Sequence, residues 1–193
     1  MTQPQTQTTD ERLLRALAVA VVQQPRATLH DLARAANVSK ATLHRFFRTR
    51  EQLIETLRSY CVTLMRQLLK EANLTTAEPI SALRQLISSH LAHKEFSSFL
   101  IYHWKPESSS VEEGKDVWKD HEAIMDAFFL RGQQEGVFRI DISAPCMTDA
   151  FGHLLCGMVE GERQGRLARA GLAQAMEQLF LHGVQTPATQ PRQ

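Results

Sequence analysis

Apolar residues recur along most of this chain at the three- and four-residue intervals of amphipathic α-helices. The stripes are separated by short polar segments that contain Pro, Gly or Asn, the residues that most often end a helix. Few aromatic residues alternate with polar ones as they would in strands. The pattern predicts an all-α fold of nine helices, at about residues 10–24, 29–36, 40–47, 50–72, 79–91, 95–102, 111–136, 145–166 and 169–184.

The stretch from Thr28 to Leu53 carries the most informative pattern. Its first helix is expected to begin after Thr28 and to end at Asn37, which tolerates the left-handed backbone of a helix C-terminus. Ser39 is expected to cap a second short helix, because its hydroxyl can accept a hydrogen bond from a free amide of the first turn. Two short helices joined by such a tight turn have the spacing of a helix-turn-helix motif, whose second helix enters the DNA major groove.

The second helix of this motif is expected to have one buried and one polar face. The residues predicted to point inward are Leu43, Phe46 and Phe47, and those predicted to point outward are Lys40, Thr42, His44 and Arg45. From Arg34 to Arg50 there are five Lys or Arg residues and no acidic residue. One-sided positive charge suits a surface that faces phosphates. The alternative is a plain helical hairpin with a solvated basic face.

These residues resemble the DNA-binding motif of the tetracycline-repressor (TetR/AcrR) family. The positions that match the family pattern are Thr28, Ala33, Ala36, Val38, Ser39, Leu43, Phe47, Glu51 and Leu53, and Leu32 stands in for an Ile. The departures are Asn37 for the turn Gly, Ala41 for the helix Gly, His44 and Phe46 for two Tyr, and Thr49-Arg50 for Ser-Lys. The motif covers about 26 residues.

The resemblance implies a two-domain regulator that binds a palindromic operator in double-stranded DNA as a homodimer. The residues expected at the DNA are Thr28, Ser39, Lys40, Ala41, Thr42, His44, Arg45, Arg48 and Arg50. Thr42 and His44 are expected near bases. Thr28, Lys40, His44, Arg48 and Arg50 are expected at phosphates, which position the protein without specifying sequence.

The expected organisation is an arm, a head and a larger C-terminal domain. Residues 1–9 are rich in Gln and Thr and are expected to be disordered. A DNA-binding domain follows at residues 10–56, with its last helix continuing to about residue 72. A ligand-binding and dimerisation domain is expected at residues 73–185, followed by a loose tail at 186–193.

The resemblance also implies an effector site in the C-terminal domain. Each large residue there is by itself a candidate for the core, but together they are expected to line a cavity for a small apolar or aromatic effector. The set is Phe96, Phe99, Tyr102, Trp104, Trp118, His121, Met125 and Phe128, with Tyr102 and His121 as polar groups.

The last two helices are expected to form the dimer interface, again from the resemblance. The residues chosen are Phe151, Leu155, Met158, Gly161, Leu172, Met176 and Leu179. Gly157, Gly161 and Gly165 recur every four residues and would permit close approach of another helix, but they also fit a weak, frayed helix end.

Charge distribution, cysteine spacing and the length of apolar runs bear on where the protein works and which end contacts DNA. Residues 1–72 hold 11 Lys/Arg and 6 Asp/Glu, whereas residues 73–193 hold 11 and 15, so positive charge is concentrated in the front half. The three cysteines lack Cys-x-x-Cys spacing and are expected to be free thiols in a reducing cytoplasm. The polar N-terminus and short apolar runs predict no secretory signal and no membrane span.

No motif of a catalytic site, a phosphate loop or a cofactor is apparent, so an enzyme is not expected. His90 and His93 lie one helical turn apart but lack a third metal ligand, and we expect no metal site. The sequence therefore predicts a DNA-binding transcriptional regulator, most plainly a repressor that an effector releases. The alternative function is a helical protein-interaction module that has lost DNA binding.

Overall fold

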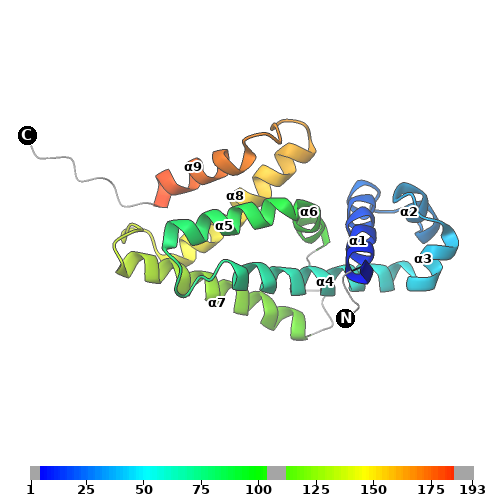
Figure 1. The fold of residues 1–193 in the computed structure, drawn as a ribbon, viewed down its shortest axis with the longest axis horizontal. Coiled ribbons are helices and arrows are strands. Elements are labelled where there is room, and N and C mark those ends of the chain that lie inside the picture. Colours follow the sequence, from blue (N-terminus) through cyan, green and yellow to red (C-terminus); the bar gives the residue numbers. More distant parts are fainter. Residues whose placement is uncertain (1–4, 104–111, 185–193) are drawn as a thin grey trace, which may run out of the picture. The chain divides into compact units, whose positions relative to one another are not determined.

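The computed structural model describes the backbone of residues 5–103 and 112–184, and the side chains of residues 11–100, 102–103 and 119–184. These residues form nine helices (Figure 1). Their bounds are α1 Gln5–Gln23, α2 Leu29–Ala35, α3 Lys40–Phe46, α4 Arg50–Glu71, α5 Pro79–Ala92, α6 Lys94–His103, α7 Glu112–Gln134, α8 Ala144–Arg163 and α9 Leu172–Val184.

The nine helices and their order confirm the predicted all-α fold. Three predicted ends are wrong: the start of α1, the start of α9 and the end of α8. Helix α1 begins at Gln5 rather than near Asp10, so residues 5–9 of the predicted disordered arm are helical, and Gln is a good helix former that can extend a helix past a possible cap. Helix α9 begins at Leu172, after Gly171 with φ +81°, rather than at Arg169. The predicted tail lies outside the described residues.

Helix α8 is also shorter than predicted, because a C-terminal cap ends it at Arg163. Gly165 adopts φ +72°, a left-handed conformation that glycine adopts without steric cost. Its amide donates to the Glu162 carbonyl, and the Arg166 amide donates to the Gly161 carbonyl, both at 2.9 Å. This is the Schellman arrangement. Gly165 therefore lies outside the helix, and the three glycines do not form a continuous row on α8.

The chain divides into two compact units, and the division falls within α4. Unit 1 comprises Met1–Leu64 and His93–Trp104, and unit 2 comprises Met65–Ala92 and Lys105–Gln193. The predicted boundary was linear along the chain, but α6 packs against α1 and therefore belongs to unit 1. Within unit 1, α1 also packs against α2, and α2 against α3.

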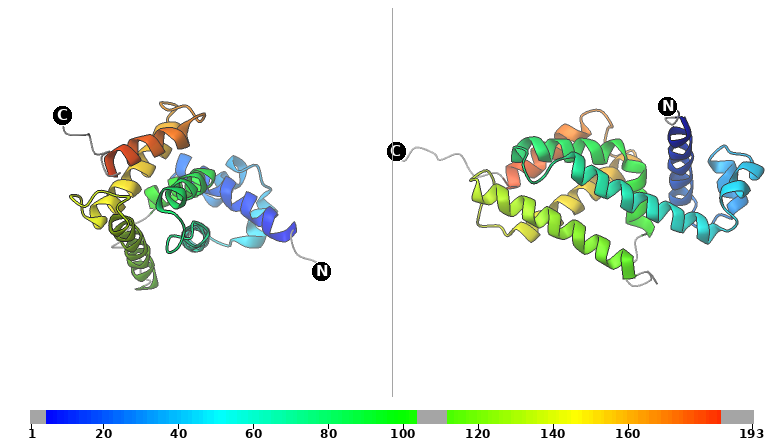
Figure 2. Two further views of the ribbon diagram at one scale, coloured as in Figure 1. Left: turned by 60° about the vertical axis from the view of Figure 1, so that its left-hand side comes forward. Right: turned by 60° about the horizontal axis from the view of Figure 1, so that its bottom comes forward.

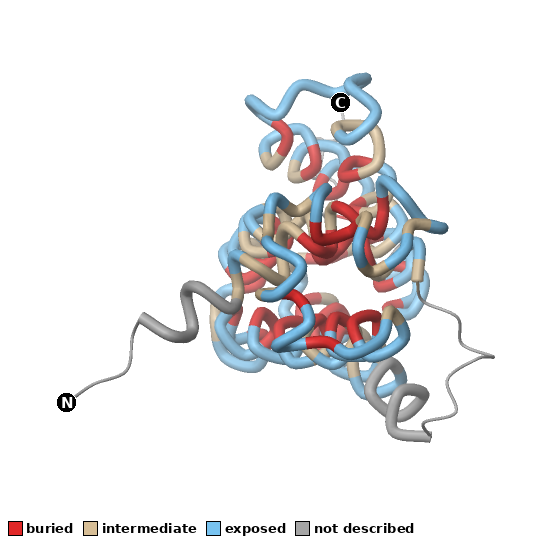
Figure 3. The backbone as a smooth tube through the Cα atoms, turned by 90° about the vertical axis from the view of Figure 1, so that its right-hand side faces the viewer, coloured by how far each residue is buried: buried red, intermediate tan, exposed pale blue. Residues whose placement is uncertain are grey.

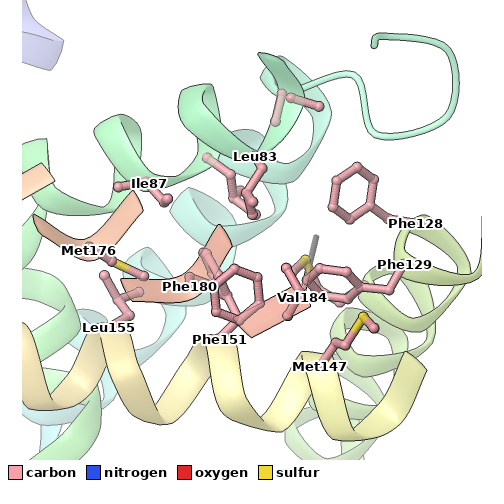
Figure 4. Close-up of a cluster of buried hydrophobic side chains, with 14 of the residues drawn as sticks. Leu83, Ile87, Phe128, Phe129, Met147, Phe151, Leu155, Met176, Phe180 and Val184 are labelled. Atoms are coloured by element: carbon pink, nitrogen blue, oxygen red, sulfur yellow. The ribbon is translucent and has the colours of Figure 1, made fainter. Parts of the chain in front are cut away.

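Unit 2 is built from α5, α7, α8 and α9 with the end of α4. Helix α7 packs against α8, α8 against α9, and α9 against α5 (Figure 2). Buried residues lie on the facing sides of the helices, and exposed residues lie on their outer sides (Figure 3). The centre is aromatic: the Phe129 ring lies 5.5 Å from that of Phe138 and 5.7 Å from that of Phe180 (Figure 4). Phe138 comes from the irregular segment after α7, so helical periodicity did not reveal it as a core residue.

None of the helices in the described part of the chain combines the length and the apolar character needed to cross a bilayer.

Candidate nucleic-acid interface

Helix α2 begins with a reciprocal cap that fixes the entrance to the motif. The Asp31 amide donates to the Thr28 hydroxyl oxygen, and the Thr28 amide donates to the Asp31 carboxylate, both at 3.2 Å. The Thr28 hydroxyl also donates to Asp31 at 2.6 Å. These hydrogen bonds from Thr28 hold the pKa of Asp31 below its usual value. Thr28 thus has a structural role beside the predicted phosphate contact.

The turn between the two helices has the predicted form. Asn37 adopts φ +54°, and the Val38 amide returns to the Ala33 carbonyl at 2.9 Å. Ser39 then caps α3, because its hydroxyl oxygen accepts from the Thr42 amide at 3.0 Å. The Ser39 and Thr42 hydroxyls are also hydrogen-bonded to each other at 2.8 Å. These local hydrogen bonds define the turn between α2 and α3 and the start of α3.

The buried face of α3 differs from the prediction at one residue. Leu43 and Phe47 are buried, but Phe46 is 39% exposed, so its prediction as a core residue is wrong. The helix ends at Phe46, and Phe47 has an extended backbone that turns its ring inward in place of Phe46. The Phe46 ring is instead covered on one face by the Arg45 guanidinium, whose carbon lies 4.7 Å from the ring centroid.

Most of the predicted DNA-binding residues are exposed, and only Thr42 and Arg50 are partly buried. Within the described residues, no ion pair joins Lys40, Arg45 or Arg48 to a carboxylate. The outer side of α3 therefore carries positive charge that the protein itself leaves available. Such a surface suits phosphates and base edges.

Arg50 is held by the protein more tightly than predicted. Its Nη2 donates to the Pro25 carbonyl at 2.7 Å, which fastens the start of α4 to the loop between α1 and α2. This structural contact was not visible in the sequence because it joins residues 25 positions apart. The predicted phosphate contact of Arg50 stays a prediction.

Unit 1 also contains a charged cluster that joins α1 to α6. The Arg15 guanidinium donates to Glu95 at 2.6 Å and to Glu11 at 2.9 Å, and it lies 5.3 Å from the centroid of the Phe96 ring. Phe96 also contacts Tyr60 of α4: the centroids of the two rings are 4.8 Å apart. Phe96 therefore packs between α1, α4 and α6.

The predicted effector residues are divided between the two units. Phe96, Phe99 and the half-exposed Tyr102 lie in unit 1 on α6, whereas His121, Met125 and Phe128 lie in unit 2 on α7. Trp104 and the side chain of Trp118 lie outside the described residues. The predicted cavity stays a prediction.

Two histidines of unit 2 lie among apolar groups. His90 is buried, and its Nδ1 lies 2.8 Å from the Leu86 carbonyl, so this nitrogen carries the proton and donates. Burial, with a smaller contribution from His90, lowers the pKa of His121 to about 4. His121 is therefore neutral at pH 7. His93 lies in unit 1, where its Nδ1 is 3.1 Å from Arg15 Nη2. Within the described residues, no group of three potential ligands could hold a metal ion.

Most of the residues predicted at the dimer interface face the core of their own protomer. Phe151, Leu155, Met158, Leu172 and Met176 are buried, and Figure 4 shows Phe151, Leu155 and Met176 pointing into the cluster around Phe180. Their predicted contact with a second copy stays a prediction. Periodicity identified the apolar stripe, but it cannot say which partner covers it.

The glycine in the predicted dimer set is also occupied within the protomer. A Cβ added at Gly161 would lie 2.8 Å from Leu167 Cδ1, so its own chain covers this position. Leu179 is different, because it is 62% exposed on α9. It is the predicted interface residue that is fully available to a second copy.

Comparison with known proteins gives concordant results. The sequence model of the family described as "Bacterial regulatory proteins, tetR family" matches residues 23–57. The chain is 49% identical over 179 residues to the HTH-type transcriptional regulator NfxB of Pseudomonas aeruginosa, covering 93% of this chain and 96% of the relative. It is 29% identical over 94 residues to the HTH-type transcriptional repressor LfrR of Mycolicibacterium smegmatis, covering 49% of this chain and 50% of LfrR.

Solved structures share the fold. A crystal structure of LfrR from Mycobacterium smegmatis in complex with proflavine is similar with a TM-score of 0.68 at 22% identity, covering 93% of this chain and 98% of LfrR. The structure of the ketosteroid regulator KstR2 of Mycobacterium tuberculosis is similar with a TM-score of 0.75 at 17% identity, covering 95% of this chain and 97% of that chain. The match extends well beyond the helix-turn-helix motif.

Proposed function

This chain belongs to the tetR family of bacterial regulatory proteins and is a DNA-binding transcriptional regulator, and we propose that it acts as a homodimeric repressor of a palindromic operator. The observation that carries the proposal is the positive charge on and just after α3: Lys40, Arg45 and Arg48 are exposed, and within the described residues no carboxylate pairs with them. In this proposal the protein works in the cytoplasm, where it reaches its DNA directly.

Two copies of α3 would enter successive major grooves about one helical turn, ~34 Å, apart. Two DNA-binding units joined in one dimer are needed, because a single seven-residue helix buries too little surface for specific binding. The exposed sides of α8 and α9, with Leu179 among their residues, supply the proposed contact between the copies.

We further propose that a small apolar or aromatic effector releases the protein from DNA. The support is the aromatic character of α7, which carries Phe128 and Phe129, together with a related fold, LfrR, that has been crystallised with proflavine. His121, neutral at pH 7, would orient such a ligand through a hydrogen bond.

The effector would act by binding more tightly to a conformation whose heads are not spaced for DNA. Linkage requires that DNA then weakens effector binding by the same factor. The corresponding coupling free energy is typically about 1–3 kcal/mol. An effector that binds both conformations equally would release nothing.

The first test measures, by fluorescence anisotropy over a salt series, how tightly the full-length protein binds labelled DNA from upstream of its own gene. A random duplex of equal length is the control. We expect tighter binding to the upstream DNA and a steep loss of affinity with salt, because Lys and Arg displace counterions from phosphates. Equal, weak binding to both duplexes at every salt concentration would contradict a repressor that acts at this DNA.

The phosphate contacts are tested with Arg48→Gln. We expect affinity to fall for both duplexes alike and the slope of log affinity against log salt to decrease by about one. Arg66→Gln, an exposed cation on α4 outside the motif, is the matched control and should leave the slope unchanged. An unchanged slope for Arg48→Gln would remove this residue from the proposed footprint.

A further inference from the structure

The position of each residue around α3 follows from the 100° turn between successive residues. Leu43 is buried and defines the inner side of the helix. Ala41 and Arg45 then lie about 160° from Leu43 in opposite directions of rotation, so they form the outermost ridge. Thr42 and His44 lie on the flanks of this ridge. The residue most centrally directed toward a major groove is therefore Arg45, with the small Ala41 one turn before it.

The neighbouring Phe46 holds the Arg45 side chain in a defined position. Its ring is 39% exposed beside α3, and the guanidinium carbon of Arg45 lies 4.7 Å from the ring centroid. Stacking on an aromatic face favours a cation and restricts its rotamers. Because the guanidinium lies over the ring, the side chain is held in place while its N–H donors can still meet a pair of acceptors.

The flanking residues are less free to read bases. The Thr42 hydroxyl is hydrogen-bonded to Ser39 at 2.8 Å and so already has a partner in the cap of α3. Ala41 offers only a methyl group. Arg34, the nearest cation on α2, pairs with Asp31 at 3.1 Å. Arg45 differs from Arg34 because, within the described residues, no carboxylate pairs with it.

We propose that Arg45, supported by the Phe46 ring, reads a guanine in each half-site of the operator. In the major groove, guanine presents O6 and N7 as two adjacent acceptors, and an arginine fork matches both. The outermost ridge of α3 faces the base edges, whereas the phosphates lie to either side of the groove, so a central arginine favours a base contact. Phe46 is then a positioning residue that acts through Arg45. The inference rests on the proposed palindromic operator, since it assigns one base pair in each half.

The experiment is selection of preferred sites from a pool of random duplexes by the full-length protein, read by sequencing. The variants are Arg45→Gln, Phe46→Leu and Phe46→Tyr, with Arg48→Gln as the matched control. The three side chains that these four variants change are exposed, and circular dichroism melting of each variant checks that the fold is retained.

We expect the wild type to select a two-fold motif with guanine at one fixed position in each half-site. Arg45→Gln should change that position to adenine, which glutamine pairs through N6 and N7, and leave the other positions as they were. Discrimination for guanine should fall roughly ten- to a hundred-fold. Phe46→Leu should weaken the same preference alone, and Phe46→Tyr should restore it because the ring remains. Arg48→Gln should weaken all sequences alike.

An Arg45→Gln motif identical to that of the wild type would overturn the guanine assignment and leave the repressor proposal intact. A Phe46→Leu motif identical to that of the wild type would overturn the positioning role of the ring. If the wild type itself selects no motif, the palindromic operator fails and the guanine assignment fails with it.

Discussion

At the scale of single residues, the burial of each side chain decides its chemistry. Cys61 is buried in unit 1 with its thiol directed at the Phe96 carbonyl, 3.9 Å away, and burial raises its pKa to about 12. Cys156 is half-buried, and burial raises its pKa as well. Cys146 is exposed at the start of α8. The three thiols are alike in the sequence and differ only through their surroundings.

We therefore predict that a thiol reagent modifies the native protein at Cys146 first, at Cys156 more slowly, and at Cys61 only on unfolding. The reactive species is the thiolate, which burial suppresses at Cys61. A time course with Ellman's reagent, repeated on Cys146→Ser and Cys156→Ser, assigns each phase. Rapid modification of Cys61 in the native protein would contradict its buried position.

The second prediction concerns His121 and the stability of the protein in acid. Its pKa is lowered from 6.5 to about 4 on folding, so between these values the unfolded chain binds a proton that the folded chain does not. Folding stability should therefore fall as pH decreases from 6.5 to 4, by up to about 3 kcal/mol from this group.

Urea unfolding of the wild type and of His121→Gln across this pH range checks the prediction. The variant should lose less stability between pH 7 and pH 4 than the wild type. His30→Gln, which removes an exposed imidazole, is the control and should follow the wild type. Parallel pH profiles for the wild type and His121→Gln would show that this histidine does not titrate as described.

At the scale of elements, the ends of the helices depend on a few residues with special backbone or close packing. Gly136 has φ +74° after α7, as Gly165 does after α8, and each permits its helix to close with a Schellman turn. Gly132 in α7 serves a different purpose. A Cβ there would lie 2.2 Å from Phe138, so the glycine admits a core ring against the helix.

This contrast gives a third prediction. Gly132→Ala should destabilise the protein by about 1–3 kcal/mol, because the added methyl collides with the Phe138 ring. Gly157→Ala should stabilise the protomer by up to about 1 kcal/mol, because no heavy atom of the described structure lies within 4 Å of the added Cβ and alanine favours a helix. Thermal unfolding of both variants tests the pair, and equal shifts in Tm would refute the packing argument.

At the scale of the whole molecule, the proposed function requires two DNA-binding units at a fixed spacing, and the outer sides of α8 and α9 are the proposed means of pairing. Leu179 is the largest exposed apolar residue of these two helices, with 62% of its surface accessible. Apolar side chains at the centre of an interface contribute most of its free energy. A charge at this position should therefore separate the copies without entering the core.

The fourth prediction is that Leu179→Glu gives a monomer in sedimentation velocity at micromolar concentration and loses affinity for operator DNA. Leu130→Glu on α7 is the matched control, since Leu130 is also exposed, at 50%, but lies outside the proposed interface. It should remain dimeric and bind DNA as the wild type does. A dimeric Leu179→Glu would place the interface elsewhere, and a monomeric wild type would remove the dimer altogether.

The sequence by itself was sufficient for features that rest on local interactions. The caps by Thr28 and Ser39 and the left-handed Asn37 each involve groups within five residues of one another, so composition and spacing predict them. The number and order of the helices follow from the same short-range periodicity. The positive charge of α3 is likewise a property of a few consecutive residues.

Only the tertiary structure decided which groups from distant parts of the chain meet. The sequence marks Phe46 and Phe47 as equally apolar, and the end of α3 determines that Phe47 is buried while Phe46 supports Arg45. The sequence shows that α8 and α9 each carry an apolar stripe. Packing around Phe180 determines that most residues of these stripes belong to the core of the protomer. Hydrophobic burial is non-directional, so a sequence specifies that a face is covered, and the three-dimensional arrangement specifies by what.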